Sequence, residues 1–436
     1  MPLLPLAEAA RAGDAAAAEA AIARLSGGPL AVLTRALRGW TALARGSDPL
    51  AALDAPGNDP IARRFAAENR ALLLIATGKS AEGTAALAAL GPAGIPVDTR
   101  FAAVQLLLGR GERTAAQTLA AGDPALAATL AGPGAKPTLG FGVAQLFTRV
   151  AAELADGTPP PLSVALTRAA LVADPTSDRA RLLLADALIK GGSGDRALLV
   201  LDQVAPASPW AGAAAMQRIS ALDTEGDAAG ALAAAQARAA RSGATAADLQ
   251  VYADLLVTRG RPADAAPIYR RLLDSGSGTR WAAWLQYGGA LDQAGRWRQA
   301  RAALEQAVKL APAEPLALNY LGYARIEHGE AMAASAKMLE RANALAPNDA
   351  SIADSLGWAY HLTGDTPRGL PLLERAAARE PTNAEISEHL GDAYWTVGRR
   401  YEARYAWRAA AVTANADDAA RLAAKITNGL GKDRRR

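Results

Sequence analysis

Few residues of this chain have the types and spacing that chemistry requires. The three histidines are His328, His361 and His389, and a metal site would need at least two of them to converge. His361 and His389 occupy positions that differ by six residues within their successive repeat units. Along a helix axis this difference is about 9 Å, at about 1.5 Å per residue. We therefore expect these histidines on a surface or in a groove rather than on a metal ion.

Patterns for nucleophilic or phosphate chemistry do not occur either. Ser355 stands beside Asp354 and near His361, but neither a nucleophile turn nor an oxyanion arrangement accompanies it. The 436 residues include no cysteine, which excludes disulfides, zinc-thiolate centres and a thiol nucleophile. No glycine-rich loop precedes a lysine-bearing helix. The sequence therefore predicts that the protein is not an enzyme and has no cofactor and no metal site.

A ladder of regularly spaced glycines organises the chain instead. Twelve glycines follow one another at intervals of 32 to 35 residues, with a single interval of 46. They are Gly13, Gly46, Gly78, Gly111, Gly157, Gly192, Gly226, Gly260, Gly295, Gly329, Gly364 and Gly398. A fixed period in this range is typical of stacked helical hairpins. We expect each glycine to end a first helix in the left-handed conformation, because glycine adopts it without steric cost.

Prolines and small residues repeat with the glycines. Pro312 follows the second helical stretch of one unit and is expected to end it, and the same proline recurs at Pro209, Pro347 and Pro381. Five residues after most glycines stands an alanine, where two helices are expected to approach closely: Ala18, Ala51, Ala116, Ala197, Ala231, Ala265, Ala300, Ala334 and Ala403. A larger packing residue follows four or five positions later: Leu201, Tyr269, Leu304, Leu339, Leu373 and Trp407.

These small and large positions resemble the tetratricopeptide repeat over essentially the whole chain, most strongly from Leu162 to Ala411. Segments 318–323, 354–360 and 389–395 look like the C-terminal repeats of a long bacterial subgroup that includes outer-membrane lipoproteins. One branch of it is an adaptor for a periplasmic carboxy-terminal processing protease. The resemblance implies an all-α, right-handed superhelical solenoid of about twelve hairpins. It also implies a non-catalytic scaffold for a protein or peptide partner, such as that protease or its substrates.

Five regions are expected along the chain. Degenerate hairpins occupy 1–131, a Gly/Pro-rich seam 132–142, the repeat array 143–415, a capping helix 416–430 and a basic tail 431–436. The seam is read as an irregular surface loop or, alternatively, as a hinge. The capping helix is predicted because Leu422, Ile426 and Leu430 recur every four residues.

The concave face of the last three hairpins is the predicted binding site. In the family, residues three before, one after and four after the repeated Leu-Gly glycine point to this face. They are here Asn319, Tyr323, Ile326, Asp354, Trp358, His361, Glu388, Asp392 and Trp395. Aromatic rings beside carboxylates suit a peptide with basic or amide groups. The alternative is that Trp358 and Trp395 only pack between repeats.

Charge and the start of the chain bear on the partner and the location. The net charge of +4 is mild, and the basic residues are scattered, so a nucleic-acid-binding helical repeat is the alternative function rather than the first. No segment reaches membrane-spanning length. The first eight residues lack the basic and apolar stretches of a signal peptide. We expect a periplasmic or cell-envelope protein whose leader is missing here, with the cytoplasm as the alternative.

Overall fold

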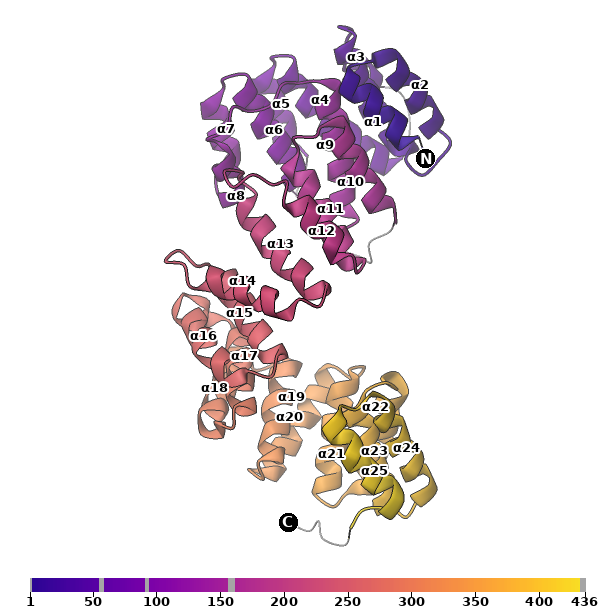
Figure 1. Cartoon of the computed structure of the whole chain (residues 1–436), viewed down its shortest axis with the longest axis vertical. Coiled ribbons are helices and arrows are strands. Elements are labelled where there is room, and N and C mark those ends of the chain that lie inside the picture. The colour runs from indigo at the N-terminus through magenta and orange to yellow at the C-terminus, as the bar shows by residue number, and fades with distance from the viewer. Residues whose placement is uncertain (1, 55–58, 91–93, 156–160, 432–436) are drawn as a thin grey trace. The chain divides into compact units, whose positions relative to one another are not determined.

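The computed structural model describes residues 2–54, 59–90, 94–155 and 161–431 (Figure 1). These residues form 25 α-helices and three short 3-10 turns, and they contain no strand. The all-α array of hairpins is therefore confirmed. The chain divides into two compact units, Met1–Ala235 and Gln236–Arg436.

Helices α1 to α13 belong to the first unit, and α14 (Ala228–Ala239) contains the boundary. The first eight are α1 Leu3–Ala12, α2 Ala15–Leu25, α3 Thr34–Ala44, α4 Pro60–Ala76, α5 Ser80–Ala88, α6 Val97–Gly109, α7 Arg113–Ala120 and α8 Pro124–Thr129. The next five are α9 Leu139–Glu153, α10 Pro161–Ala173, α11 Asp178–Lys190, α12 Gly194–Leu201 and α13 Ala211–Thr224.

The second unit contains five hairpins and one further helix. The hairpins are α15 Ala246–Thr258 with α16 Pro262–Asp274, α17 Trp281–Gln293 with α18 Trp297–Leu310, α19 Pro315–Glu327 with α20 Met332–Leu345, α21 Ala350–Leu362 with α22 Thr366–Arg379, and α23 Ala384–Thr396 with α24 Arg400–Thr413. The last helix, α25 (Ala416–Asn428), lies within the predicted capping segment, and the Asn415 side chain accepts from the Asp418 N–H at its start.

The glycine ladder marks the turns inside the hairpins, as predicted. Eleven of its twelve members have a positive φ, between 68° and 93°. Gly157 lies outside the described residues. Pro312, Pro347 and Pro381 follow the ends of α18, α20 and α22, whereas Pro209 lies well beyond the end of α12 at Leu201. The proline stop thus follows three of the five second helices of the second unit.

Glycines in the first helices allow the two helices of a hairpin to pack in direct contact. A Cβ added to Gly288 would lie 2.7 Å from Leu304, one on Gly322 3.0 Å from Leu339, and one on Gly357 2.8 Å from Leu373. At Gly391 the added atom would overlap the Trp407 ring. Leu304, Leu339, Leu373 and Trp407 are fully buried. Glycine is required here because any larger side chain would separate the helices.

Two of the predicted alanine positions are wrong. Ala51 is exposed, because a 3-10 turn, Ala51–Leu53, replaces the second helix of its hairpin. Ala334 is also exposed, and the buried position belongs to Ser335. The shift arises from one additional residue in the turn, since Ala331 adopts a φ of 50° just before α20 begins.

The first unit departs from a simple stack of neighbours. Helix α9 packs against α1, α3 and α6, the first helices of earlier hairpins, while α10 packs against α1. One continuous apolar core accordingly runs from Leu3 to Leu183. The segment 132–142 does not divide this core. The Ala135 N–H donates to the Gln105 carbonyl at 2.8 Å, and Gly134 touches Gly109, so this segment is packed against α6.

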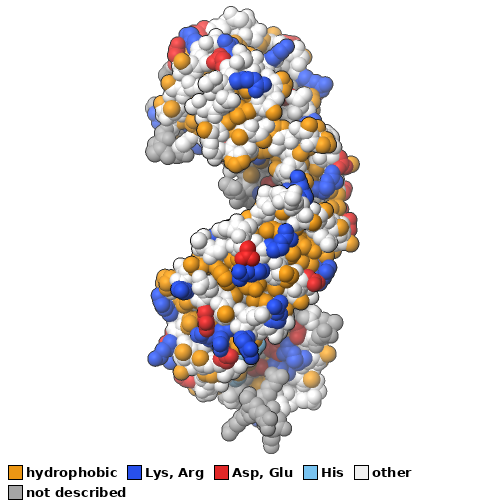
Figure 2. Space-filling model, turned by 90° about the vertical axis from the view of Figure 1, so that its left-hand side faces the viewer, with side chains coloured by type: hydrophobic (Ala, Val, Ile, Leu, Met, Phe, Trp, Pro, Cys, Tyr) orange, Lys and Arg blue, Asp and Glu red, His pale blue; other side chains and the backbone are white. Residues whose placement is uncertain are grey.

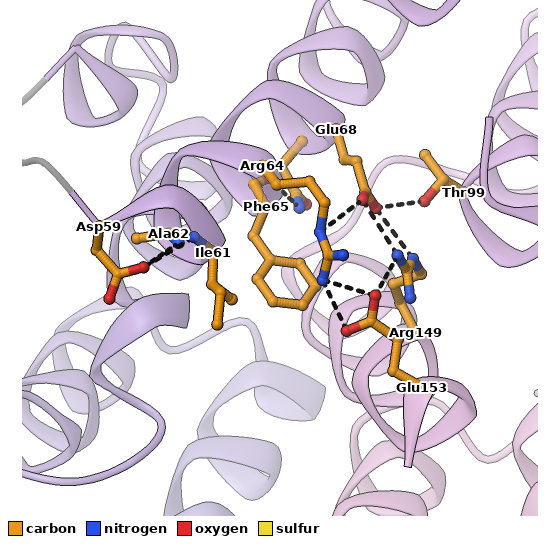
Figure 3. Close-up of polar contacts among 10 residues, drawn as sticks. Asp59, Ile61, Ala62, Arg64, Phe65, Glu68, Thr99, Arg149 and Glu153 are labelled. Carbon is orange, nitrogen blue, oxygen red and sulfur yellow. Dashed lines mark hydrogen bonds and ion pairs between the residues drawn. The ribbon is translucent and has the colours of Figure 1, made fainter. Parts of the chain in front are cut away.

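A buried polar network ties α9 to the helices around it (Figure 3). The Glu68 carboxylate on α4 is 1% exposed and lies 3.1 Å from Arg149 Nε on α9. Thr99 on α6 donates to the same carboxylate at 2.7 Å. Arg149 also reaches Glu153 at 2.7 Å, and the half-exposed Arg64 reaches Glu153 at 2.6 Å. Each buried charge thus has an opposite charge within contact distance, as burial requires.

Replacing Ala331 by Gly is expected to raise the free energy of unfolding by about 0.5 to 1 kcal/mol. Alanine in the left-handed region is strained, and removing that strain outweighs the entropy glycine adds to the unfolded chain. The matched control is Ala302→Gly in exposed mid-helix α18, which should lower the free energy of unfolding by about 1 kcal/mol. Urea denaturation measures both. A loss of stability at position 331 would contradict the strained turn.

Removing the buried carboxylate should strongly destabilise the first unit. Glu68→Ala leaves the Arg149 guanidinium buried without this partner, so we expect a loss of about 3 to 5 kcal/mol. Arg64→Ala removes a half-exposed partner of the same network and should cost about 1 kcal/mol or less. Thermal unfolding of the full chain measures both losses of stability. Hydrogen exchange shows whether each loss falls in the first unit. Equal losses for the two variants would show that burial of the charge is unimportant.

Candidate partner-binding groove

The first helices of the second unit form a continuous layer. Helix α17 packs against α19, α19 against α21 and α21 against α23, while each second helix packs mainly on the first helices before and after it in the chain. Neighbouring first helices are therefore closer together than neighbouring second helices. A surface curved in this way is concave on the side of the first helices.

Charge is sharply divided between the two layers. The five first helices, α15, α17, α19, α21 and α23, contain eight acidic residues and one basic residue, Arg325. The acids are Asp248, Asp254, Asp292, Glu327, Asp354, Glu385, Glu388 and Asp392. The five second helices contain thirteen lysines and arginines against six acids. The first-helix layer is accordingly acidic and the second-helix layer basic.

The nine predicted site residues lie on α19, α21 and α23, and most of them contact side chains outside the set. Trp358 is central: its ring stacks on His361 at 4.9 Å and on His389 at 4.0 Å between ring centroids. Its Nε1–H donates to Glu327 at 3.0 Å. The His389 Nδ1 lies 2.8 Å from Asp354, and Tyr323 donates to Glu385 at 2.7 Å. His361 and His389 therefore stack on one indole, that of Trp358.

Helix α25 packs against α24, and its basic side chains reach the last first helix, α23. Lys425 contacts Glu388 at 2.5 Å and Asp392 at 2.6 Å, and Arg421 also pairs with Glu388. Trp407 donates to Asp392 at 2.8 Å. At the end of α25, Gly429 rests on the Trp395 ring, which Arg400 and Arg404 also contact. All three predicted site residues of α23 are thus contacted or covered by the chain itself.

Several predicted site residues are less accessible than the sequence suggested. Asp354, Glu388 and Asp392 are each less than 10% exposed, and Ile326 is 3% exposed. Contacts with His389 and with side chains of α25 account for the burial of these three acids. The alternative in which Trp358 and Trp395 pack between helices agrees with their contacts. Two buried oxygens, Asn319 Oδ1 and Asp354 Oδ1, have no hydrogen-bond partner among the described residues.

Residues 256–322 match the tetratricopeptide repeat family. The chain is a tetratricopeptide-repeat protein. The match begins in α15 and ends in α19, and the same hairpin turns and helix contacts continue through α24.

Three solved structures illustrate the similarity. A tetratricopeptide repeat protein from Parabacteroides merdae ATCC 43184 is 15% identical, with 57% of this chain and 98% of that chain covered and a TM-score of 0.49. The APC/C hetero-tetramer Cut9-Hcn1 is 14% identical, with 96% and 88% covered and a TM-score of 0.47. A thermophilic tetratricopeptide repeat protein of Thermus thermophilus is 19% identical, with 43% and 99% covered and a TM-score of 0.38. None of the curated proteins matches the sequence.

Two further searches of the described residues concern metals and membranes. No group of three or more histidine, aspartate or glutamate side chains there is placed to hold a metal ion. Across the same residues, every helix is too short or too polar to cross a membrane.

Sequence reasoning missed two features of this repeat array. The first is the division of charge, which becomes visible only when charged residues are sorted by first and second helix. The second is the role of Lys425 and Arg421, which lie four residues apart on α25 and meet the acids of α23. Their spacing places both on one helix face, but the surface they meet depends on how α25 folds back.

The Asp354–His389 pair gives the groove a titratable element. Burial lowers the pKa of the His389 imidazole, but the Asp354 carboxylate more than offsets burial, and the pKa lies above its ordinary value. Burial lowers the pKa of His361, against the opposing effect of Asp392. Trp358 therefore stacks on one histidine that favours its charged form and one that favours its neutral form.

The effect of Asp354→Asn on stability should depend on pH. A histidine with a raised pKa stabilises the fold below its unfolded pKa of about 6.5 and loses this contribution as pH rises through the folded value. We expect the variant's deficit in free energy of unfolding to be largest near pH 6 and to shrink toward pH 9. In a His389→Gln background the effect of Asp354→Asn should no longer vary with pH. Chemical denaturation across this range measures it, and a deficit that grows with pH would contradict the pair.

Proposed function

We propose that this tetratricopeptide-repeat protein is a non-catalytic scaffold whose acidic first-helix layer binds a basic amphipathic helix of a partner protein. The observation that carries the proposal is that α25, which packs against α24, sends its basic side chains onto the carboxylates of α23. The chain's own helix places Lys425 between two carboxylates of a first helix, at 2.5 and 2.6 Å. A partner helix with similar chemistry would find further acids in Asp292 of α17 and Glu327 of α19.

The contacts of α25 define the ligand class. Its apolar residues Leu422 and Ile426 join the core formed by Trp407 and its neighbours, and Leu422 is 1% exposed. Lys425 and Arg421 project from the same helix onto Glu388. Burial of the apolar face supplies most of the affinity, and charge complementarity selects the basic partner and its register. The recognition mode is a helix in a groove.

Three acids of the layer are less covered than Glu388 and Asp392. Glu327 and Glu385 are exposed, and Asp292 is partly exposed beside His328 at 2.8 Å. Each accepts a hydrogen bond from, or lies against, a neighbouring aromatic or imidazole group. These carboxylates are held in place in the free protein, so binding a basic helix would require little ordering of side chains.

The resemblance to bacterial envelope repeat proteins extends the proposal. We propose that the partner is a periplasmic carboxy-terminal processing protease or a substrate recruited to it, and that the protein acts in the periplasm or at the cell envelope. Against the nucleic-acid alternative stands the sign of the first-helix charge, since a phosphate backbone requires basic residues there. On the face drawn in Figure 2, lysine and arginine are scattered among acidic and hydrophobic side chains rather than joined in a stripe.

A pair of designed peptides tests the proposed helix recognition. The first is an amphipathic leucine–lysine helix of about 20 residues, and the second has the same sequence with glutamate in place of lysine. We expect the basic peptide to bind and the acidic one not to bind, with affinity falling as salt is added. Asp292→Asn with Glu327→Gln should weaken binding about tenfold, because two attractive charges are lost while their acceptor oxygens remain.

The matched control neutralises two acids of the opposite layer. Asp264 and Asp274 lie exposed on α16, and Asp264→Asn with Asp274→Asn should leave the affinity of the basic peptide unchanged. Fluorescence anisotropy with labelled peptides measures both double variants. Equal binding of the acidic and basic peptides, or equal losses in the two double variants, would refute recognition by the first-helix layer.

A further inference from the structure

A cavity of about 500 Å³ lies within the first unit, far along the chain from the acidic layer. Its walls come from α6, α9, the Gly/Pro-rich segment 132–138, the turn between α10 and α11, and the start of α13. Its volume is within the range of small-ligand sites, which combine apolar walls with a few polar groups. The segment that the sequence suggested as a hinge is therefore one wall of this cavity.

Gln145 is the unusual polar group of the cavity. It lines the cavity from α9, a helix whose other faces are buried in the core, and it is 8% exposed. Both its Oε1 and its Nε2 are buried without a hydrogen-bond partner among the described residues. A buried amide without partners costs stability, and a leucine of similar size would not incur this cost. This cavity-lining side chain thus carries one unpaired donor group and one unpaired acceptor.

One part of the surrounding wall is aromatic and electrically balanced. Phe101 and Trp210 meet edge to face with ring centroids 5.4 Å apart, and Phe141 lines the wall beside them. The Arg179 guanidinium lies 5.3 Å from the Trp210 ring and is paired with Asp98 at 2.5 Å. Because Asp98 and Arg179 neutralise each other, this aromatic part of the wall favours a neutral apolar or aromatic group, while Lys136, Asp174 and Asp178 line other parts of the cavity.

We propose that this cavity binds a neutral carboxamide bearing an aromatic or apolar group, with Gln145 pairing to its amide. A carboxamide has one N–H donor beside one carbonyl acceptor, so Gln145 Oε1 accepts from it while Nε2 donates to it. The aromatic walls bury the apolar group. Either a free small molecule or a segment of a peptide chain supplies this chemistry. The site lies in the first unit and is independent of the proposed helix-binding function.

Three probes test the site in the full chain by calorimetry and saturation-transfer NMR. They are 3-phenylpropanamide, its methyl ester analogue methyl 3-phenylpropanoate, and the peptide acetyl-Gly-Phe-Gly-amide. The amide should bind at least about tenfold more tightly than the ester, which lacks N–H donors and leaves Gln145 Oε1 unpaired. Tighter binding of the peptide than of the amide indicates a peptide ligand, and exclusion of the peptide indicates a free small molecule.

The Gln145→Leu variant separates this site from a merely structural glutamine. It should abolish the preference for the amide over the ester, and it should raise the thermal midpoint of the ligand-free chain because an unpaired buried amide is removed. Gln203→Leu, at an exposed position of the same unit, is the matched control and should leave the preference intact. Absence of saturable amide binding at millimolar concentration, or a preference that survives in Gln145→Leu, would overturn the proposal.

Discussion

The close approach of two helices within each hairpin is the constraint on which the rest of this structure depends. Where Gly288, Gly322, Gly357 and Gly391 stand, the second helix inserts a large side chain directly against the first helix's backbone. The left-handed glycine of the turn sets the chain direction that makes this contact possible. Because four successive hairpins of the second unit repeat the same contact, their first helices align with one another, and a layer of one chemical character can form.

That layer is covered by other parts of the chain in both units, through related interactions. In the first unit α9 packs against earlier first helices, and its Arg149 meets Glu68 of α4. In the second unit α25 packs against α24, and its Lys425 meets Glu388 and Asp392 of α23. In each case a cation from the covering helix pairs with a buried carboxylate of a first helix. The pairing fixes position and register more than it adds stability, since desolvation offsets much of the attraction.

Some buried polar atoms have no hydrogen-bond partner among the described residues, and each of them lowers the stability of the fold. Asn319 and Asp354 each keep one such buried oxygen in the acidic layer, and Gln145 keeps both amide atoms in the cavity of the first unit. Core positions elsewhere in the same helices are largely alanine, leucine or glycine. The cost is local to each atom, since the other Asp354 oxygen still pairs with His389 at 2.8 Å.

The sequence by itself determined the repeat, because glycine in a left-handed turn and alanine or glycine at a helix crossing are local steric requirements that leave a fixed period. It also placed the capping helix and the residues of the last three first helices. It did not determine that Asp354, Glu388 and Asp392 are buried, that Ser335 replaces Ala334, or that α9 packs against α1 and α3. Those facts depend on contacts between segments distant along the chain. A periodic pattern specifies each helix's packing face but not which distant side chain will meet it.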